Sequence, residues 1–188
     1  EKVIKLEIDN KTKSAFREVT TIYNKAVTDK NEVQIIKCFF YKSKYIMSLE
    51  EEAQYKIISN LEYEINKASI PSKALLNLVY VKCLNSYLLV NRYKLQKRTK
   101  LDSIKANDFL TWTDKDFEDK IEITYEETLE NEEILKNTNL KNYSEIFDFF
   151  NEEYFNKSSL YNYLIQSNID YYSTKIREWH YYNPNNNQ

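Results

Sequence analysis

The sequence predicts an all-α fold, an irregular array of antiparallel helix pairs that resembles either a tetratricopeptide-like stack of αα-hairpins or a helix bundle. Three observations predict it: the 188-residue chain has no glycine, it has only two prolines, and its apolar residues recur at three- and four-residue spacing. Glycine supplies the positive-φ positions of tight hairpin turns and phosphate-binding loops. A chain without glycine therefore favours helices joined by Asn, Asp and Ser turns over a β-sandwich or a Gly-rich nucleotide site.

The first third of the chain predicts three amphipathic helices after a short N-terminal segment. Residues 1–11 form that segment, either as an extension or as a lone strand, because residues 3–8 partly alternate between apolar and polar side chains. The first helix is expected over residues 12–27. The second runs from a cap at Asn31 to about Met47, and the third follows a capping box at 48–51 and ends near Ala68. The apolar positions of these helices are Ala15, Val19, Ile22, Tyr23, Ala26, Ile35, Ile36, Phe39, Phe40, Ile46, Tyr55, Ile58, Leu61, Ile65 and Ala68.

The remainder predicts a central apolar helix, a connection and a C-terminal helical part. Residues 71–93 begin with Pro71, which is favoured in a first helical turn, and form the most apolar helix of the chain. Residues 94–111 are less periodic and predict a long connection. A fifth helix begins after Thr113, short helical pieces cover 132–136 and 143–150, and a last helix begins after Ser158 or Ser159. The last helix carries one apolar stripe, which comprises Leu160, Leu164, Ile165, Ile169, Tyr172 and Ile176. Residues 12–178 thus form a single helical domain, and 179–188 form a polar tail.

Composition excludes several classes of protein. The chain carries 27 basic and 29 acidic residues, and this balance argues against a general nucleic-acid binder, whose affinity comes mainly from phosphate neutralisation. We expect no transmembrane segment, because no uninterrupted apolar run reaches the roughly 18–20 residues that cross a bilayer. The sequence begins without Met or a signal pattern, which suggests a processed protein or a piece of a longer one. Cys38 and Cys83 are expected to be buried free thiols, with a disulfide as the alternative.

No constellation of residues indicates catalysis, a cofactor or a metal. The acidic group at 114–119 lacks the glycine turn of a calcium loop and is typical of a helix N-terminus instead. A nucleophilic site would have to use His180, the only histidine, near the end of the chain. We therefore expect a non-enzyme. A helical hydrolase or lyase using Glu, Tyr and Lys is the alternative, and it predicts a deep pocket with strongly shifted carboxylates.

Two groups of residues are candidates for interaction. The first is a basic run that either binds an anionic group or complements the dipole of the preceding helix; it comprises Arg92, Lys94, Lys97, Arg98 and Lys100. The second is an aromatic patch just after the last helix, which either contacts a protein or docks on its own core; it comprises Trp179, Tyr181 and Tyr182. Trp112 directly precedes the fifth helix, where it is expected to form a hydrophobic staple with Phe117.

A series of short phrases, in order, carries a resemblance to a known family. The phrases are Lys13-Ser14-Ala15, Ile22-Tyr23-Asn24-Lys25-Ala26, Gln34-Ile35-Ile36-Lys37, Asn91-Arg92-Tyr93, Arg98-Thr99, Asp108, Thr111-Trp112-Thr113, Tyr125, Leu129, Ser159-Leu160-Tyr161-Asn162-Tyr163-Leu164 and Ile169-Asp170-Tyr171-Tyr172. Over residues 12–175 this series resembles the helical N-terminal region of large alpha-2-macroglobulin-family envelope proteins of Bacteroidetes-type bacteria. The chain departs from the family at 158–161, where Ser158-Ser159-Leu160-Tyr161 replaces a Pro-Thr-Leu-Tyr-like phrase.

The resemblance implies a non-catalytic docking or spacer domain of a very large protease-trapping protein in the bacterial cell envelope. Its partners would be other domains of that protein or envelope proteins, and proteases only through the full-length protein. Neither Cys38 nor Cys83 lies in a Cys-Leu-Glu-Gln thioester context, and no bait region is recognisable. The trapping chemistry is therefore expected outside this segment.

A second hypothesis is a free-standing helical adaptor, exported or cytoplasmic, that binds cytoskeletal or membrane-associated partners. The abundance of Asn, Lys and Tyr, with 17 tyrosines, is typical of AT-rich genomes such as those of some eukaryotic parasites. Genomic context and the identity of the bound partner distinguish the two hypotheses.

Overall fold

The computed structural model describes residues 1–98, 108–147 and 152–182, and it confirms the all-α fold. Within these ranges the only β-type pairing is one isolated bridge between Asn139 and Ser159. The α-helices are α1 (Lys2–Ile8), α2 (Thr12–Thr28), α3 (Glu32–Leu49), α4 (Ala53–Lys67), α5 (Ile70–Leu95), α6 (Asp114–Glu127), α7 (Glu132–Asn137), α8 (Glu152–Lys157) and α9 (Leu160–Tyr182). Two 3₁₀ turns, η1 (Phe109–Thr111) and η2 (Leu140–Tyr143), lie between them.

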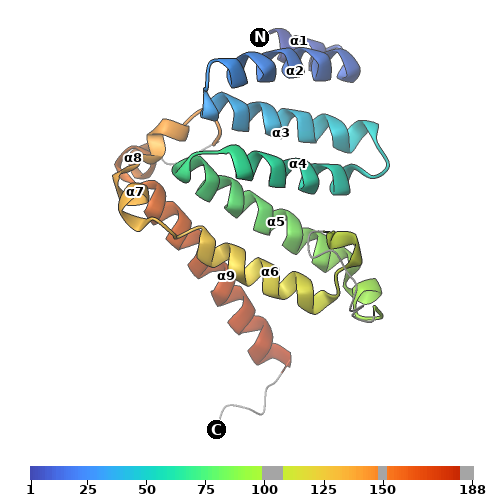
Figure 1. The fold of residues 1–188 in the computed structure, drawn as a ribbon, viewed down its shortest axis with the longest axis vertical. Coiled ribbons are helices and arrows are strands. Elements are labelled where there is room, and N and C mark those ends of the chain that lie inside the picture. Colours follow the sequence, from blue (N-terminus) through green and yellow to red (C-terminus); the bar gives the residue numbers. More distant parts are fainter. Residues whose placement is uncertain (99–107, 148–151, 183–188) are drawn as a thin grey trace.

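Helices α1 to α6 stack side by side in chain order, each against the one before it (Figure 1). Turns of two or three residues join the consecutive helices from α1 to α5 and make these neighbours antiparallel, as the sequence predicts for helix pairs. The chain then turns back, and α9 packs against α7 and α5. The result is an elongated array in which the N-terminus and the end of α9 lie at opposite ends of the longest axis (Figure 1).

The turns of the stack are built without glycine. Asn10, Lys30 and Asn131 each adopt a positive φ of 54° to 61°, in the left-handed region that most residues avoid. Asn31 then caps α3 as predicted, because its side-chain oxygen accepts a hydrogen bond from the backbone N–H of Gln34 at 3.0 Å. Amide side chains therefore help to end one helix and begin the next where glycine is absent.

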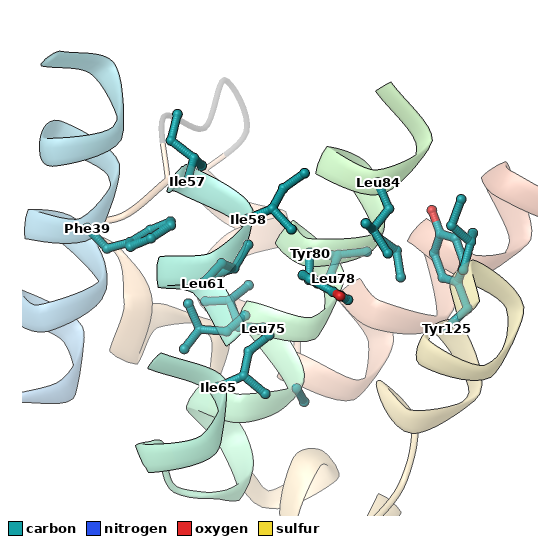
Figure 2. Close-up of a cluster of buried hydrophobic side chains, with 14 of the residues drawn as sticks. Phe39, Ile57, Ile58, Leu61, Ile65, Leu75, Leu78, Tyr80, Leu84 and Tyr125 are labelled. Carbon is teal, nitrogen blue, oxygen red and sulfur yellow. The ribbon is translucent and has the colours of Figure 1, made fainter. Parts of the chain in front are cut away.

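Helix α5 is the central helix, as its apolar sequence predicts. Its buried residues pack against α4 on one side and α6 on the other, and Leu75, Leu78, Tyr80 and Leu84 lie in the cluster of side chains shown in Figure 2. By length and composition α5 would also be able to cross a membrane, although half of its most apolar window is buried within the protein. The core helices of soluble proteins have the same length and composition, so α5 is weak evidence for a membrane span.

Four local predictions are wrong. Residues 2–8 form helix α1 and not a strand, because Val3 and Leu6, one turn apart, pack onto the cluster around Ala15 and Val19. The capping box at 48–51 does not form: Ser48 lies inside α3 and donates to the Lys44 carbonyl oxygen, and Glu52 precedes α4.

The other two errors concern the C-terminal part. Residues 140–143 form the 3₁₀ turn η2 and a turn follows it, in place of a helix over 143–150; positions 148–150 lie outside the described residues. The last helix continues to Tyr182 and does not end at 178, so the first four residues of the expected polar tail are helical. Residues 183–188 of that tail lie outside the described residues.

Candidate docking surfaces

Much of the predicted basic run has partners within the protein. Arg92, on the last turns of α5, forms an ion pair with Glu118 of α6 at 2.7 Å. The Lys97 ammonium lies 3.9 Å from the ring centroid of Tyr93, in the geometry of a cation–π contact. Lys94 is exposed on α5, and Lys100 lies outside the described residues. The structure thus uses part of the run to join α5 to α6.

The corner between α5 and α6 is held by Arg98 and by the start of α6. Arg98 donates from Nη1 to the carbonyl oxygen of Trp112 at 2.9 Å. Thr113 and Asp116 form a reciprocal capping box at the N-terminus of α6. The predicted staple is confirmed, since the rings of Trp112 and Phe117 meet edge to face with centroids 5.2 Å apart.

The aromatic residues at the C-terminus belong to the last turns of α9. Trp179, Tyr181 and Tyr182 were expected after the helix, but the backbone is helical through Tyr182. Trp179 lies about one helical turn beyond Ile176 along α9. The orientations of these three side chains lie outside the described part of the structure.

A groove of about 530 Å³, lined by both polar and apolar side chains, lies between α2, α3, α4 and the start of α5. Inside it, the Tyr23 hydroxyl donates to the Glu64 carboxylate at 2.5 Å. Burial and the neighbouring carboxylate raise the pKa of Tyr23 well above its usual value, so the phenol stays neutral. This hydrogen bond joins α2 to α4, and the Glu64 carboxylate is its acceptor.

The carboxylates with shifted pKa are held in their ionised form. For Glu32, burial opposes ionisation, but hydrogen bonds from Ser69 and Ser72 lower its pKa overall. Hydrogen bonds from Lys44 and Tyr45 likewise lower the pKa of Glu7. These side chains act as acceptors that join α3 to α5 and α1 to α3. Across the described ranges, no three His, Cys, Asp or Glu side chains converge as metal ligands do.

Both cysteines are free thiols, as predicted. Cys38 is buried on α3, whereas Cys83 is only partly buried on α5. Burial raises the pKa of each thiol, which keeps it protonated and poorly nucleophilic at neutral pH.

One apolar groove, of about 430 Å³, opens on the face formed by α3, α4 and α5. We call it the α3–α5 groove. Its lining includes Phe40, Ile57 and Val79, together with the exposed Met47 and the partly buried Cys83. An apolar groove lined in part by methionine is typical of surfaces that bind varied apolar partners.

A second groove, of about 520 Å³, lies between α6 and α9. We call it the α6–α9 groove. The sequence analysis predicts one apolar stripe along the last helix, and the structure divides that stripe in two. Leu160 and Leu164 are fully buried, whereas Ile169 and Ile176 are 51% and 57% exposed. The second half of α9 therefore presents apolar side chains that no described element covers.

The α6–α9 groove lies in a strongly acidic region, of which the sequence analysis recognised only the acidic group at 114–119. Residues 114–133 contain ten carboxylates and two lysines, and residues 1–100 contain 19 basic and 11 acidic residues. The near-neutral net charge of the whole chain hides this separation, because the basic excess of residues 1–100 offsets the acidic excess of residues 114–133. Charge counted by segment would have shown it.

The chain was compared with protein-family models, with curated proteins and with solved structures, and nothing matches it.

Proposed function

We propose that this chain is a non-catalytic helical docking domain, which offers grooves between its helices to other proteins or to other domains. The observation that carries this proposal is the presence of two apolar grooves, the α3–α5 groove and the α6–α9 groove, on one stack of helices. Exposed apolar surface in a concave site is typical of protein contacts.

The polar chemistry of the domain supports the same proposal. Buried polar side chains bond to neighbouring helices: Ser72 of α5 pairs with Tyr143 at 3.1 Å, and Tyr80 of α5 donates to Glu62 of α4 at 2.5 Å. A rigid frame of this kind presents its grooves in one geometry, and a binding surface that is already ordered loses less conformational entropy when a partner docks.

Site-specific photo-crosslinking in the cells that encode the chain tests the proposal. A photoreactive phenylalanine derivative replaces Ser86 in the α3–α5 groove or Ser173 in the α6–α9 groove, both exposed lining residues. Asn60, exposed on α4 outside both grooves, is the matched control position. We expect a discrete crosslinked protein from at least one groove position and none from Asn60. Equal crosslinking at all three positions would contradict a docking function.

The family resemblance extends the proposal to a setting. We propose that the domain belongs to a large alpha-2-macroglobulin-like protein of the bacterial envelope, in which it spaces or docks other domains while trapping chemistry lies elsewhere. The ordered phrases over residues 12–175 support this extension. Its test is the native reading frame, which should encode bait- and thioester-bearing domains. A frame without them would contradict the envelope setting, and a cytoskeletal crosslinked partner would favour the adaptor hypothesis instead.

A further inference from the structure

The exposed half of α9 carries a continuous apolar stripe. Ile165, Ile169, Tyr172 and Ile176 all line the α6–α9 groove, at helical spacings of three and four residues. From Ile165 to Ile176 the stripe extends about 16 Å along the helix, at 1.5 Å per residue. That length matches three turns of a second helix laid alongside it.

The opposite wall of the groove comes from the end of α6 and the turn that follows it. Leu129 contributes an apolar side chain and Glu126 a carboxylate. Burial and the nearby carboxylates of Glu122 and Glu126 raise the pKa of the Tyr172 hydroxyl. The ring centroids of Tyr125 on α6 and Tyr172 on α9 are 6.2 Å apart, so the two walls approach each other at this point. A channel between two adjacent helices is the place where a third helix packs in helical proteins.

The charge at the border of the groove is predominantly negative. Glu126 and the nearby Glu130 are exposed, and no ion pair to either is seen among the described residues. Glu122 forms an ion pair with Lys175, and within the described part of the chain the Asp170 carboxylate accepts a hydrogen bond only from the neutral amide of Gln166. A partner that placed acidic side chains beside this border would be repelled, whereas one with basic side chains would gain both attraction and orientation.

We infer that the α6–α9 groove binds a basic amphipathic helix of a partner protein. This inference rests on the proposed docking function and names its surface and the partner's chemistry. The apolar face of the partner helix lies on Ile169, Tyr172 and Ile176, and its lysines and arginines border the carboxylates of Glu126 and Glu130. Helix-in-groove binding of this kind takes its affinity from apolar anchors and its selectivity from the surrounding charge.

Defined peptides test the inference directly. The probe is a fluorescein-labelled amphipathic peptide of about 18 residues, with leucines on one helical face and lysines on the other. One control peptide carries glutamates in place of the lysines, and a second has the composition of the probe in an order without an apolar face. Fluorescence anisotropy with the full chain should show binding of the lysine peptide that weakens as salt increases. The glutamate peptide should bind at least about tenfold more weakly.

Variants of the protein locate the site. Ile169→Ser and Ile176→Ser should each weaken binding of the lysine peptide about tenfold. Both residues are exposed, so we expect each variant to fold. Ile123→Ser is the matched control, since Ile123 is also 51% exposed, on α6, but does not line the groove. Glu126→Lys should slow association and reduce the salt dependence. Circular dichroism confirms that each variant retains its helices.

Three results would overturn the inference. The first is equal binding of the lysine and glutamate peptides, and the second is binding that Ile169→Ser and Ile176→Ser leave unchanged. The third is concentration-dependent self-association, measured by light scattering, that Ile169→Ser abolishes, because a second copy would then occupy the groove. In each case crosslinking from Ser86 or Ser173 to a partner would still support a docking domain, so the two proposals fail separately.

Discussion

Tyr125 of α6 and Tyr171 of α9 stack face to face, with ring centroids 4.2 Å apart and planes inclined by 25°. The pair joins two helices that are distant in sequence, beside the α6–α9 groove. One turn away, Asn168 of α9 donates from its buried side chain to the Thr128 hydroxyl at 3.1 Å and to the Leu164 carbonyl oxygen at 2.9 Å. These contacts fix the position of α9 beside α6, and with it the width of the groove.

The Tyr125 phenol makes stability depend on alkaline pH. Burial raises the pKa of Tyr125 to about 12, against about 10 in the unfolded chain. Because the folded pKa is the higher one, the stabilisation is complete below pH 10 and is lost as pH rises towards 12. Between pH 9 and pH 12, the free energy of unfolding should therefore fall by about 2 kcal/mol less in Tyr125→Phe than in the wild type, because phenylalanine does not ionise. Urea unfolding followed by circular dichroism measures both. Equal losses in wild type and variant between pH 9 and pH 12 would contradict the assignment.

Removing the Asn168 side chain should destabilise the C-terminal part. Asn168→Ala leaves the buried Thr128 hydroxyl without its donor, and we expect the free energy of unfolding to fall by about 1–3 kcal/mol. Asn162→Ala, at an exposed position on the same helix, is the matched control and should change it by less than about 0.5 kcal/mol. Urea unfolding at neutral pH measures both, and equal effects of the two variants would rule out the proposed contact.

The capping box at the N-terminus of α6 should be worth measurable stability. Thr113 accepts a hydrogen bond from the Asp116 backbone N–H at 3.2 Å and donates to the Asp116 carboxylate at 2.8 Å. Thr113→Ala should therefore lower the free energy of unfolding by about 1 kcal/mol, whereas Thr113→Ser should retain most of it. Thr21→Ala, exposed in the middle of α2, controls for the loss of a hydroxyl. A serine variant as unstable as the alanine variant would show that the cap is not the cause.

Two residues of the basic run should behave differently. Arg98→Gln removes the charge-assisted bond to the Trp112 carbonyl oxygen and should cost about 1 kcal/mol of stability, measured by urea unfolding. Lys94→Gln, on the exposed side of α5, should cost less than about 0.5 kcal/mol. If both substitutions were silent, and phosphate stabilised only the wild type, the basic run would be an anion site and not a structural corner.

The sequence predicted what depends on local chemistry. Asn31 before an apolar periodic segment, Thr113 before an acidic turn, and Trp112 beside that cap are all determined within a few residues, and the structure confirms each of them. The burial of α5 also followed from composition, since its apolar residues cover most of its circumference and must be enclosed on several sides.

The wrong predictions depend on partners that are distant in sequence or on competing local bonds. The segment containing Val3 and Leu6 fits both a strand and a helix, and only the neighbouring α2 favours the helix. The Ser48 hydroxyl can either cap a helix N-terminus or donate to a backbone carbonyl one turn back, and in the structure it donates to the Lys44 carbonyl oxygen. Propensity and capping rules do not decide such cases, because tertiary contact overrides them.

The α6–α9 groove was missed because one apolar stripe has two possible environments. Leu164 and Ile169 read alike in the sequence, yet α7 and α5 cover the first part of α9 and leave the second part open. Which half is covered depends on where the chain turns back after α6, and no local pattern encodes that. The acidic excess of residues 114–133 was the available signal, and it was hidden by the balanced total.

The left-handed turns at Asn10, Lys30 and Asn131 have a thermodynamic consequence. A denatured chain without glycine samples fewer backbone conformations than one of average composition, since each glycine adds freedom equivalent to about 0.4–1 kcal/mol relative to alanine. Folding of this protein therefore gives up less disorder per residue than is usual. The absence of glycine therefore has two effects: it places three non-glycine residues in the left-handed region, and it reduces the conformational entropy that the chain loses when its helices form.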